Sequence, residues 1–254
     1  MRAAKQLTRA LGLRQMIAEI AVRLATVHES PGWTVTRFDQ GAPFTGRVAV
    51  LSSAFNPPTH AHVSLLELAA SVEGVTGVAA MLTTNNVDKS LFGAPLSHRV
   101  GMLLALGEAE PGGVAVLASN AARFVDQAEA LRVIYPGAGF DFVAGFDTLV
   151  RIFDRRYYDD IETVLGRLFE HHRLIVTNRA QATVDAVAAF VDTAEVRPYA
   201  HGIIVRELDD HPASLSSTQA REHAERGEVP PAVPPAVAAY IARHGLYGMG
   251  GDSR

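Results

Sequence analysis

Cysteine is absent from all 254 residues of the chain. Without cysteine the protein cannot form a disulfide, use a thiolate nucleophile or bind zinc through thiolates, and a reducing compartment is compatible with that absence. A long hydrophobic run is missing too, since no apolar stretch approaches the roughly 18 residues that suggest a membrane span. The apolar segment 233–241 is interrupted by Pro234 and Pro235. We therefore expect a cytoplasmic protein with no membrane partner.

A surplus of positive charge is also lacking. Lys and Arg number 23 against 27 for Asp and Glu, so the net charge is −4. Proteins that bind duplexes carry a clustered basic surplus, and we therefore expect no nucleic-acid partner. A small anionic ligand remains compatible with this charge, because a phosphate site needs only a few cations and oriented backbone amides.

Several common phosphate and metal motifs are missing. There is no Gly-Lys dipeptide, which excludes a P-loop, and no G-x-G-x-x-G follows the first predicted strand. No zinc-type H-E-x-x-H occurs. The pair His171-His172 lies between a predicted helix and strand, where neighbouring side chains point apart, so we interpret both as surface or half-buried imidazoles. We predict no metal-ligating residues.

The regular pattern of the chain alternates short apolar runs with amphipathic stretches. The runs predict strands at 47–53, 77–82, 114–118, 140–144, 173–177 and 202–205. Helices are predicted near 62–72, 97–106, 121–134, 160–169, 182–192 and 217–226. This alternation is typical of α/β proteins with a doubly wound, Rossmann-like parallel sheet covered on both faces. Ligands of such sheets bind beyond the carboxyl ends of the strands, where the strand order reverses.

The N-terminal residues carry arginines and apolar residues at mostly helical spacing, and Pro31-Gly32 ends that pattern. We predict an N-terminal helical extension over 1–45, with 33–38 as a short strand or an arm. The main domain is predicted at 46–249 and a tail at 250–254. An organelle-targeting or membrane-surface role for the first 28 residues is the alternative. The sequence leaves a homo-oligomer open.

The first candidate motif follows the first predicted strand of the main domain. It reads A-F-N-P-P-T-H-A-H over residues 54–62, and its two prolines fix a rigid loop. Thr59 and His62, three residues apart, share one face at the start of the next helix. A helix N-terminus offers free N–H groups and positive potential to phosphate. The structural alternative is a capping Thr59 and a packed His62.

The second candidate motif follows the last predicted strand and reads L-S-S-T-Q-A-R over residues 215–221. Three successive hydroxyl residues are natural helix caps. Capping does not require Arg221, however, and this side chain can reach the same phosphate as Thr218. Both a phosphate site and a simple capped helix are compatible with the motif.

Together the two motifs resemble those of the nicotinamide and nicotinate mononucleotide adenylyltransferases of the nucleotidyltransferase superfamily. That family carries G-x-F-[ND]-P-x-[HT]-x-G-H after a strand and I-S-S-T-x-x-R much later. The ending V-P-P-A-V to Y-I-A-R-H-G-L-Y (233–247), Asn85-Asn86-Val87 with Lys89, His98-Arg99 and Gly145-Phe146-Asp147 are also similar to the family. The resemblance covers residues 47–247 and implies a Rossmann-like fold of the nucleotidyltransferase type.

The resemblance also implies an activity and a set of site residues. The activity is transfer of the adenylyl group of ATP, with Mg²⁺, to a pyridine mononucleotide with release of pyrophosphate. Thr59, His62 and Arg221 are the implied catalytic residues. The residues implied for ATP binding are Ser53, Ala54, Phe55, Lys89, Gly145, Asp147, Arg179, Ser217 and Thr218.

The sequence departs from the family pattern at two places. Ser52-Ser53-Ala54 replaces a glycine-rich stretch that permits close approach of the backbone to a nucleotide. The family's aromatic residue for the pyridine ring, often Trp, is also displaced, because the only Trp here is Trp33. Tyr157 and Tyr158 are therefore the candidates for acceptor binding, and helix packing is their alternative role.

Three functions are compatible with these residues. The leading one is an adenylyltransferase that makes NAD from nicotinamide mononucleotide or its deamido form from nicotinate mononucleotide. A second is nucleotidyl transfer to another phosphorylated acceptor. A third is a nucleotide-binding regulator or weak ATPase that does not transfer the nucleotide.

Overall fold

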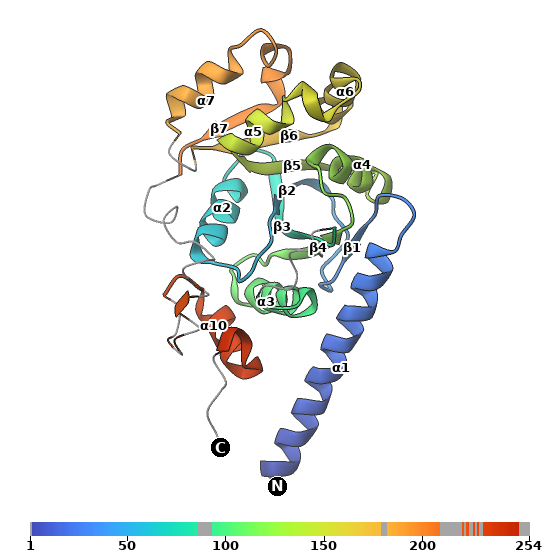
Figure 1. The fold of residues 1–254 in the computed structure, drawn as a ribbon, viewed down its shortest axis with the longest axis vertical. Helices are drawn as coiled ribbons and strands as arrows, with labels where there is room; N and C mark the ends of the chain where they lie inside the picture. The colour runs from blue at the N-terminus through green and yellow to red at the C-terminus, as the bar shows by residue number, and fades with distance from the viewer. Residues whose placement is uncertain are drawn as a thin grey trace.

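The computed structural model describes residues 2–85, 93–178, 182–208, 220, 222–223, 226, 228 and 231–248, with side chains from residue 12 onward except that of residue 13. In this part of the chain seven strands form one sheet in the order β1-β4-β3-β2-β5-β6-β7 (Figure 1). The strands are β1 (Val35–Arg37), β2 (Gly46–Ser52), β3 (Val75–Thr83), β4 (Ala115–Ser119), β5 (Ala138–Gly145), β6 (Arg173–Thr177) and β7 (Ile203–Arg206).

All neighbouring strands are parallel except the edge strand β1, which pairs antiparallel with β4. The six strands predicted from apolar runs are therefore confirmed, as is the parallel α/β class. Strand β2 lies between β3 and β5, and the chain winds outward from it in both directions. The carboxyl ends of β2 and β5 consequently form the point at which the strand order reverses, where open sheets of this kind bind ligands.

Helices cover both faces of the sheet, because alternate residues of each strand point to opposite sides. Ala49 and Leu51 of β2 belong to one buried cluster, while Val48 and Val50 belong to the other. The first cluster includes residues of α1 (Arg2–His28), α2 (His60–Ala70), α3 (Leu96–Ala109) and α10 (Pro235–His244). The second includes residues of α4 (Phe124–Ile134), α5 (Phe146–Ile152), α6 (Ile161–His171) and α7 (Val184–Val191).

The predicted helices over 62–72, 97–106, 121–134, 160–169 and 182–192 correspond to α2, α3, α4, α6 and α7. The prediction did not include α5 or α10, nor the short 3₁₀ helices Arg155–Tyr157, Arg197–Gly202 and Leu246–Gly248. The helix predicted near 217–226 lies largely outside the described residues.

The N-terminal segment packs against the same sheet. Ile20, Leu24 and Val27 of α1 are at most 5% exposed, and Ile20 and Leu24 belong to the first cluster. The N-terminal half of α1 extends beyond the sheet in Figure 1. Residues 35–37 form β1, which confirms a short strand in this segment. The division of the chain at residue 45 stays a prediction.

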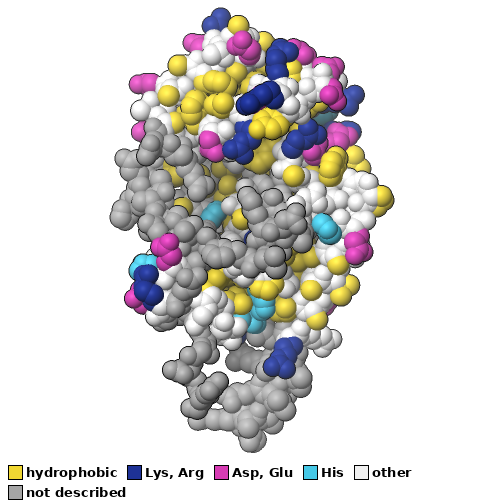
Figure 2. Space-filling view, in the orientation of Figure 1, with side chains coloured by type: hydrophobic (Ala, Val, Ile, Leu, Met, Phe, Trp, Pro, Cys, Tyr) yellow, Lys and Arg dark blue, Asp and Glu magenta, His cyan; other side chains and the backbone are white. Residues whose placement is uncertain are grey.

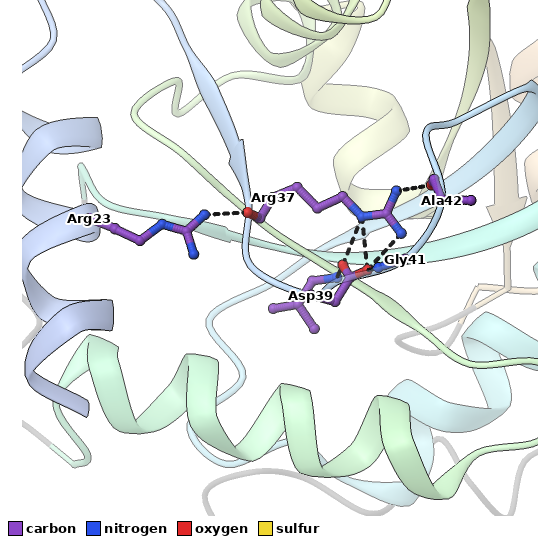
Figure 3. Close-up of polar contacts among 6 residues, drawn as sticks. Arg23, Arg37, Asp39, Gly41 and Ala42 are labelled. Carbon is purple, nitrogen blue, oxygen red and sulfur yellow. Dashed lines mark hydrogen bonds and ion pairs between the residues drawn. The ribbon is translucent and has the colours of Figure 1, made fainter. Parts of the chain in front are cut away.

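Polar contacts tie α1 and β1 to the sheet (Figure 3). Arg23 of α1 donates to the backbone oxygen of Arg37 at 2.5 Å, and the Arg37 guanidinium is paired with Asp39 at 2.6 Å. Asp39 in turn accepts from the backbone N–H of Val116 in β4 at 2.7 Å. The Arg37 hydrogen bonds hold the pKa of Asp39 below its usual range although burial opposes that shift. Within the described residues no helix is long and apolar enough to cross a membrane.

A buried carboxylate joins three strands on the β5–β6 side of the sheet. Asp141 of β5 is fully buried, and its carboxylate accepts from Arg47 of β2 at 2.8 Å and from Arg173 of β6 at 2.6 Å. Both arginines remain partly exposed. A buried charge is tolerated only when it is paired and hydrogen-bonded, and this carboxylate meets that condition.

The two adjacent histidines differ from each other in burial. His171 is exposed, as predicted, but His172 is only 3% exposed, so the prediction of a surface or half-buried ring is wrong for His172. The ring of His172 lies 6.0 Å from those of Phe140 and Phe142, because it enters the core just before β6 begins. Burial lowers the pKa of His172 to about 4, which keeps the ring neutral at physiological pH.

The face of the molecule shown in Figure 2 carries charges of both signs. Basic and acidic side chains lie next to one another over the end that carries α5 and α6. Two exposed ion pairs at this end are Arg155 with Glu162 and Arg156 with Asp154. Charges of both signs are therefore interspersed at this end of the face shown.

Candidate functional site

The loop between β2 and α2 lies at the reversal of strand order. Leu51 of β2 is in register with Val143 of β5, so Ser53 and Gly145, two residues further along each chain, meet at the carboxyl edge of the sheet. Gly145 is the N-cap residue of α5, and Asp147 is exposed in the first turn of that helix. The helices α2 and α5 thus both begin after strands that end at this edge, on opposite faces of the sheet.

The start of α2 is built around Thr59 and His62. Thr59 is the N-cap residue, and its backbone N–H donates to Nδ1 of His62 at 3.0 Å. The Thr59 hydroxyl lies 2.9 Å from the same nitrogen. Thr59 is fully buried and His62 is 5% exposed. The sequence-based expectation of a shared face is confirmed, and Thr59 is a capping residue that also orients the imidazole.

This contact fixes the tautomer of His62. A backbone N–H can only donate, so Nδ1 must be the unprotonated nitrogen and the proton of the neutral ring is on Nε2. Nε2 lies 3.1 Å from Oγ of Ser53 at the end of β2. His62 therefore directs a hydrogen-bond donor toward the carboxyl edge of the sheet, where an anion would accept it.

The backbone of the loop makes a sharp turn between Ser53 and Thr59. Phe55 is a non-glycine residue in the left-handed region, with φ of 44°, and its buried ring lies 4.9 Å from that of His62. The Asn56–Pro57 peptide is cis. Ala54 is exposed, and its carbonyl accepts from the buried Arg99 at 3.3 Å. The loop thus presents Ala54 outward while Phe55 and Asn56 anchor it.

The hydroxyl of Ser52 lies on the other side of β2 from Ser53. It accepts from the side-chain amide of Gln127 in α4 at 3.1 Å, and the same amide donates to the Ala121 carbonyl at 3.1 Å. Gln127 is fully buried. The serine that replaces a family glycine here is thus held by a contact with α4 that sequence reasoning did not reveal.

Tyr157 and Tyr158 lie beside the loop that follows β4. The guanidinium of Arg123, the N-cap residue of α4, donates to the Tyr157 carbonyl at 3.0 Å and lies 5.8 Å from the centre of the Tyr158 ring. Tyr157 is 49% exposed, whereas burial raises the pKa of Tyr158. Both residues therefore lie at the carboxyl edge near β4, with only Tyr157 offering a largely open ring.

The remaining predicted site residues cannot be placed. Lys89, Arg179, Ser217, Thr218 and Arg221 lie outside the described residues. Within the described part of the chain, no group of three His, Asp or Glu side chains is arranged to hold a metal ion.

A cavity of about 830 Å³ lies at the opposite, amino edge of the sheet, between α1, the 37–45 segment and the end of α3. Its two arginines, Arg23 and Arg37, already bond within the fold. The geometry of parallel sheets and the His62 arrangement both indicate the carboxyl edge instead.

Comparisons with known proteins show similarity in sequence and in fold. No family model matches the chain. A Desulfotalea psychrophila protein described as a candidate nicotinate-nucleotide adenylyltransferase is 26% identical over 213 residues, which cover 79% of this chain and 99% of that protein. A Schizosaccharomyces pombe protein described as a candidate nicotinamide mononucleotide adenylyltransferase is 29% identical over 52% of this chain and 53% of its own length.

Among solved structures, the Plasmodium falciparum nicotinic acid mononucleotide adenylyltransferase complexed with NaAD superposes with a TM-score of 0.61. The match covers 81% of this chain and 99% of that chain at 16% identity, so it shows a shared fold. The relatives in sequence and the neighbour in structure agree. In sequence the chain is similar to nicotinate- and nicotinamide-nucleotide adenylyltransferases, which are nucleotidyltransferase enzymes, and it shares the fold of one of them.

Proposed function

We propose that this protein transfers the adenylyl group of ATP to nicotinamide mononucleotide or nicotinate mononucleotide, which yields NAD or its deamido form and pyrophosphate. The observation that carries the proposal is the Nε2 donor of His62, fixed at the start of α2 where the strand order reverses. A phosphate bound there accepts a hydrogen bond from this directed N–H group.

The chemistry needs few reactive side chains. The phosphate of the mononucleotide is already anionic at pH 7, so it attacks the α-phosphorus of ATP without a general base. Its oxygen forms the new P–O bond while the bond to the β-phosphate oxygen breaks and pyrophosphate departs with the bonding electrons. Catalysis then consists of positioning and charge stabilisation.

Each predicted residue has a role in this scheme. His62 donates from Nε2 to phosphate oxygens as charge moves toward pyrophosphate, and Thr59 fixes the ring. Asp147, exposed beside Gly145, accepts hydrogen bonds from ribose hydroxyls. Ser53, Ala54 and Phe55 border the nucleotide. As the family resemblance implies, we propose that Ser217, Thr218 and Arg221 bind the β- and γ-phosphates, that Arg179 lies near the adenosine and that Lys89 supports a phosphate of either substrate.

The metal enters with the substrate. Since the described residues include no cluster of carboxylates or imidazoles suited to a metal ion, we propose that Mg²⁺ is held mainly by the oxygens of ATP. When bound it neutralises part of the charge of the triphosphate. The cytoplasm is the proposed location, and a homo-oligomer remains compatible with the proposal.

Transfer to a different phosphorylated acceptor is the second candidate. It is favoured by one observation, which is that the segment after Asp147 offers Tyr157 and Tyr158 beside Arg123 in place of a tryptophan. We propose that Tyr157, with its open ring, contacts the acceptor. A nucleotide-binding regulator or weak ATPase without transfer is the third candidate, because Ser52 and Ser53 occupy a stretch that is glycine-rich in the family.

Pyrophosphate release decides among the three. The protein is assayed with Mg-ATP and, separately, nicotinamide mononucleotide, nicotinate mononucleotide or no acceptor. Release with one or both pyridine nucleotides is expected. Release only with another phosphorylated metabolite would identify the second candidate, while ATP binding without transfer to any acceptor would identify the third.

A further inference from the structure

A tyrosine from the end of the chain reaches the loop between β2 and α2. Tyr247 lies in the 3₁₀ turn that follows α10, and its hydroxyl donates to Oδ1 of Asn56 at 2.7 Å. Its backbone has φ of 56°, a left-handed conformation that residues other than glycine seldom adopt. Such conformations persist where the surrounding structure determines them, and the turn here directs the ring at the loop.

Asn56 is fixed from a second direction. The residue is 8% exposed, and its Oδ1 also accepts from the backbone N–H of Ala94 at 3.1 Å. Gly93 has φ of 90°, and a Cβ atom there would overlap the Asn56 amide. The segment before α3 and the end of the chain therefore meet on one side chain of the loop.

The C-terminal segment touches the loop at its other end too. The backbone oxygen of Ala232 accepts from the N–H of His60, the first residue of α2, at 2.9 Å. Between Ala232 and Tyr247, α10 is buried against α3 through Val237 and Ile241. The C-terminal segment 232–247 thus forms hydrogen bonds with Asn56 in the loop and with His60 at the start of α2. These two residues lie on either side of Thr59, which orients His62.

We propose that Tyr247 is a positioning residue of the adenylyl-transfer site. Tyr247 holds the loop between β2 and α2 in the conformation that directs Nε2 of His62 at the bound phosphates. The inference rests on the proposed function. Tyr247 does not touch the substrate in this scheme and acts through Asn56.

The test compares two tyrosines that each lose one hydroxyl. Tyr247→Phe removes the hydrogen bond to Asn56, while Tyr240→Phe, the matched control in α10, removes a contact of 3.2 Å with His98. Hydrogen exchange of the amides in residues 53–62 is measured on both full-length variants, together with kcat and KM for pyrophosphate release. For Tyr247→Phe we expect faster loop exchange and a kcat lower by about fivefold, the effect of one lost hydrogen bond, with KM for the mononucleotide unchanged.

The exchange measurement separates this inference from the proposed function, because it needs no turnover. Loop exchange equal to that of the wild type in Tyr247→Phe overturns the positioning role, whether or not the enzyme is active. Faster exchange with an unchanged kcat also overturns it, and so does an equal fall of kcat in Tyr240→Phe. If the wild type releases no pyrophosphate, the proposed function is overturned. The exchange measurement then still decides whether Tyr247 restrains the loop between β2 and α2.

Discussion

The backbone N–H of Thr59 donates to Nδ1 of His62 at 3.0 Å, and this single bond determines which nitrogen of the imidazole faces the edge of the sheet. Protonating Nδ1 would set two N–H groups against each other, so the arrangement favours the neutral ring with its proton on Nε2. The same contact thus caps the helix and directs the Nε2 donor. A capping role for Thr59 and a phosphate-binding role for His62 are therefore compatible.

His62→Ala should lower turnover far more than ATP affinity, because we expect the imidazole to act mainly when charge moves to the departing pyrophosphate. We expect kcat to fall on the order of 100-fold, the usual effect of losing one preorganised donor, with the dissociation constant of ATP within about threefold. His60→Ala is the matched control, since His60 lies in the same helical turn. Equal losses of binding and rate in His62→Ala would mark His62 as a ground-state binding group.

Thr59→Val tests the orienting hydroxyl at constant shape. The change removes the contact of 2.9 Å with Nδ1 and weakens the helix cap, so the free energy of unfolding should fall by about 1 kcal/mol and turnover should fall with it. Thr59→Ser keeps the hydroxyl and should restore both quantities. Urea denaturation and pyrophosphate release measure the two effects. Wild-type turnover in Thr59→Val would show that the backbone N–H orients the ring alone.

Arg221→Ala tests the second motif. If its guanidinium binds the β- and γ-phosphates, the dissociation constant of ATP should rise by about tenfold or more. Arg226→Ala is the control, because Arg226 forms an exposed ion pair with Glu228 in the same part of the chain. Calorimetric titration with ATP reads both variants. Unchanged affinity in Arg221→Ala would remove this residue from the phosphate site.

Much of the fold was predictable because each buried strand is a short apolar run between amphipathic helices. The prediction missed α5 because seven residues are too few to show a helical period. It missed α10 because we read Pro234 and Pro235 as an interruption, whereas Pro235 occupies the first turn of the helix, where proline is well tolerated.

The candidate site was predictable only where contacts are local in sequence. Thr59 and His62 are three residues apart, and helical geometry alone brings them together. The contact of His62 with Ser53 depends on the left-handed turn at Phe55, and no propensity predicts that turn in a non-glycine residue. The bond between Tyr247 and Asn56 joins residues 191 positions apart, so spacing could not reveal it.

Asp141→Asn should destabilise the protein strongly. The amide cannot neutralise Arg47 and Arg173, and replacing one partner of a buried ion pair costs about 3–5 kcal/mol. Chemical denaturation should show this loss, while the folded enzyme keeps its KM because Asp141 lies within β5, away from the carboxyl edge. Glu162→Gln, which breaks the exposed pair with Arg155, should cost under about 1 kcal/mol. Similar losses in the two variants would contradict the importance of burial.

The free energy of unfolding should decrease as pH falls, because unfolding lets His172 bind a proton. Burial lowers the pKa of this ring to about 4 in the folded protein, against an ordinary value near 6.5 in the unfolded chain. Between these values the unfolded chain binds the extra proton, so the free energy of unfolding decreases as pH falls from about 6.5 to 4, by on the order of 3 kcal/mol in all. Above pH 7 the His172 ring is neutral in both the folded and the unfolded chain, so its full contribution to the free energy of unfolding is present.

Replacing the ring tests that linkage. His172→Phe keeps an aromatic side chain beside Phe140 and Phe142 and has no proton to bind, so denaturant midpoints measured between pH 7 and 4 should depend less on pH than in the wild type. His171→Phe is the control, because His171 is exposed and its loss should leave the slope unchanged. If the slopes of His172→Phe and the wild type coincide, His172 is not the group that couples acid to unfolding, and the carboxylates must carry the effect.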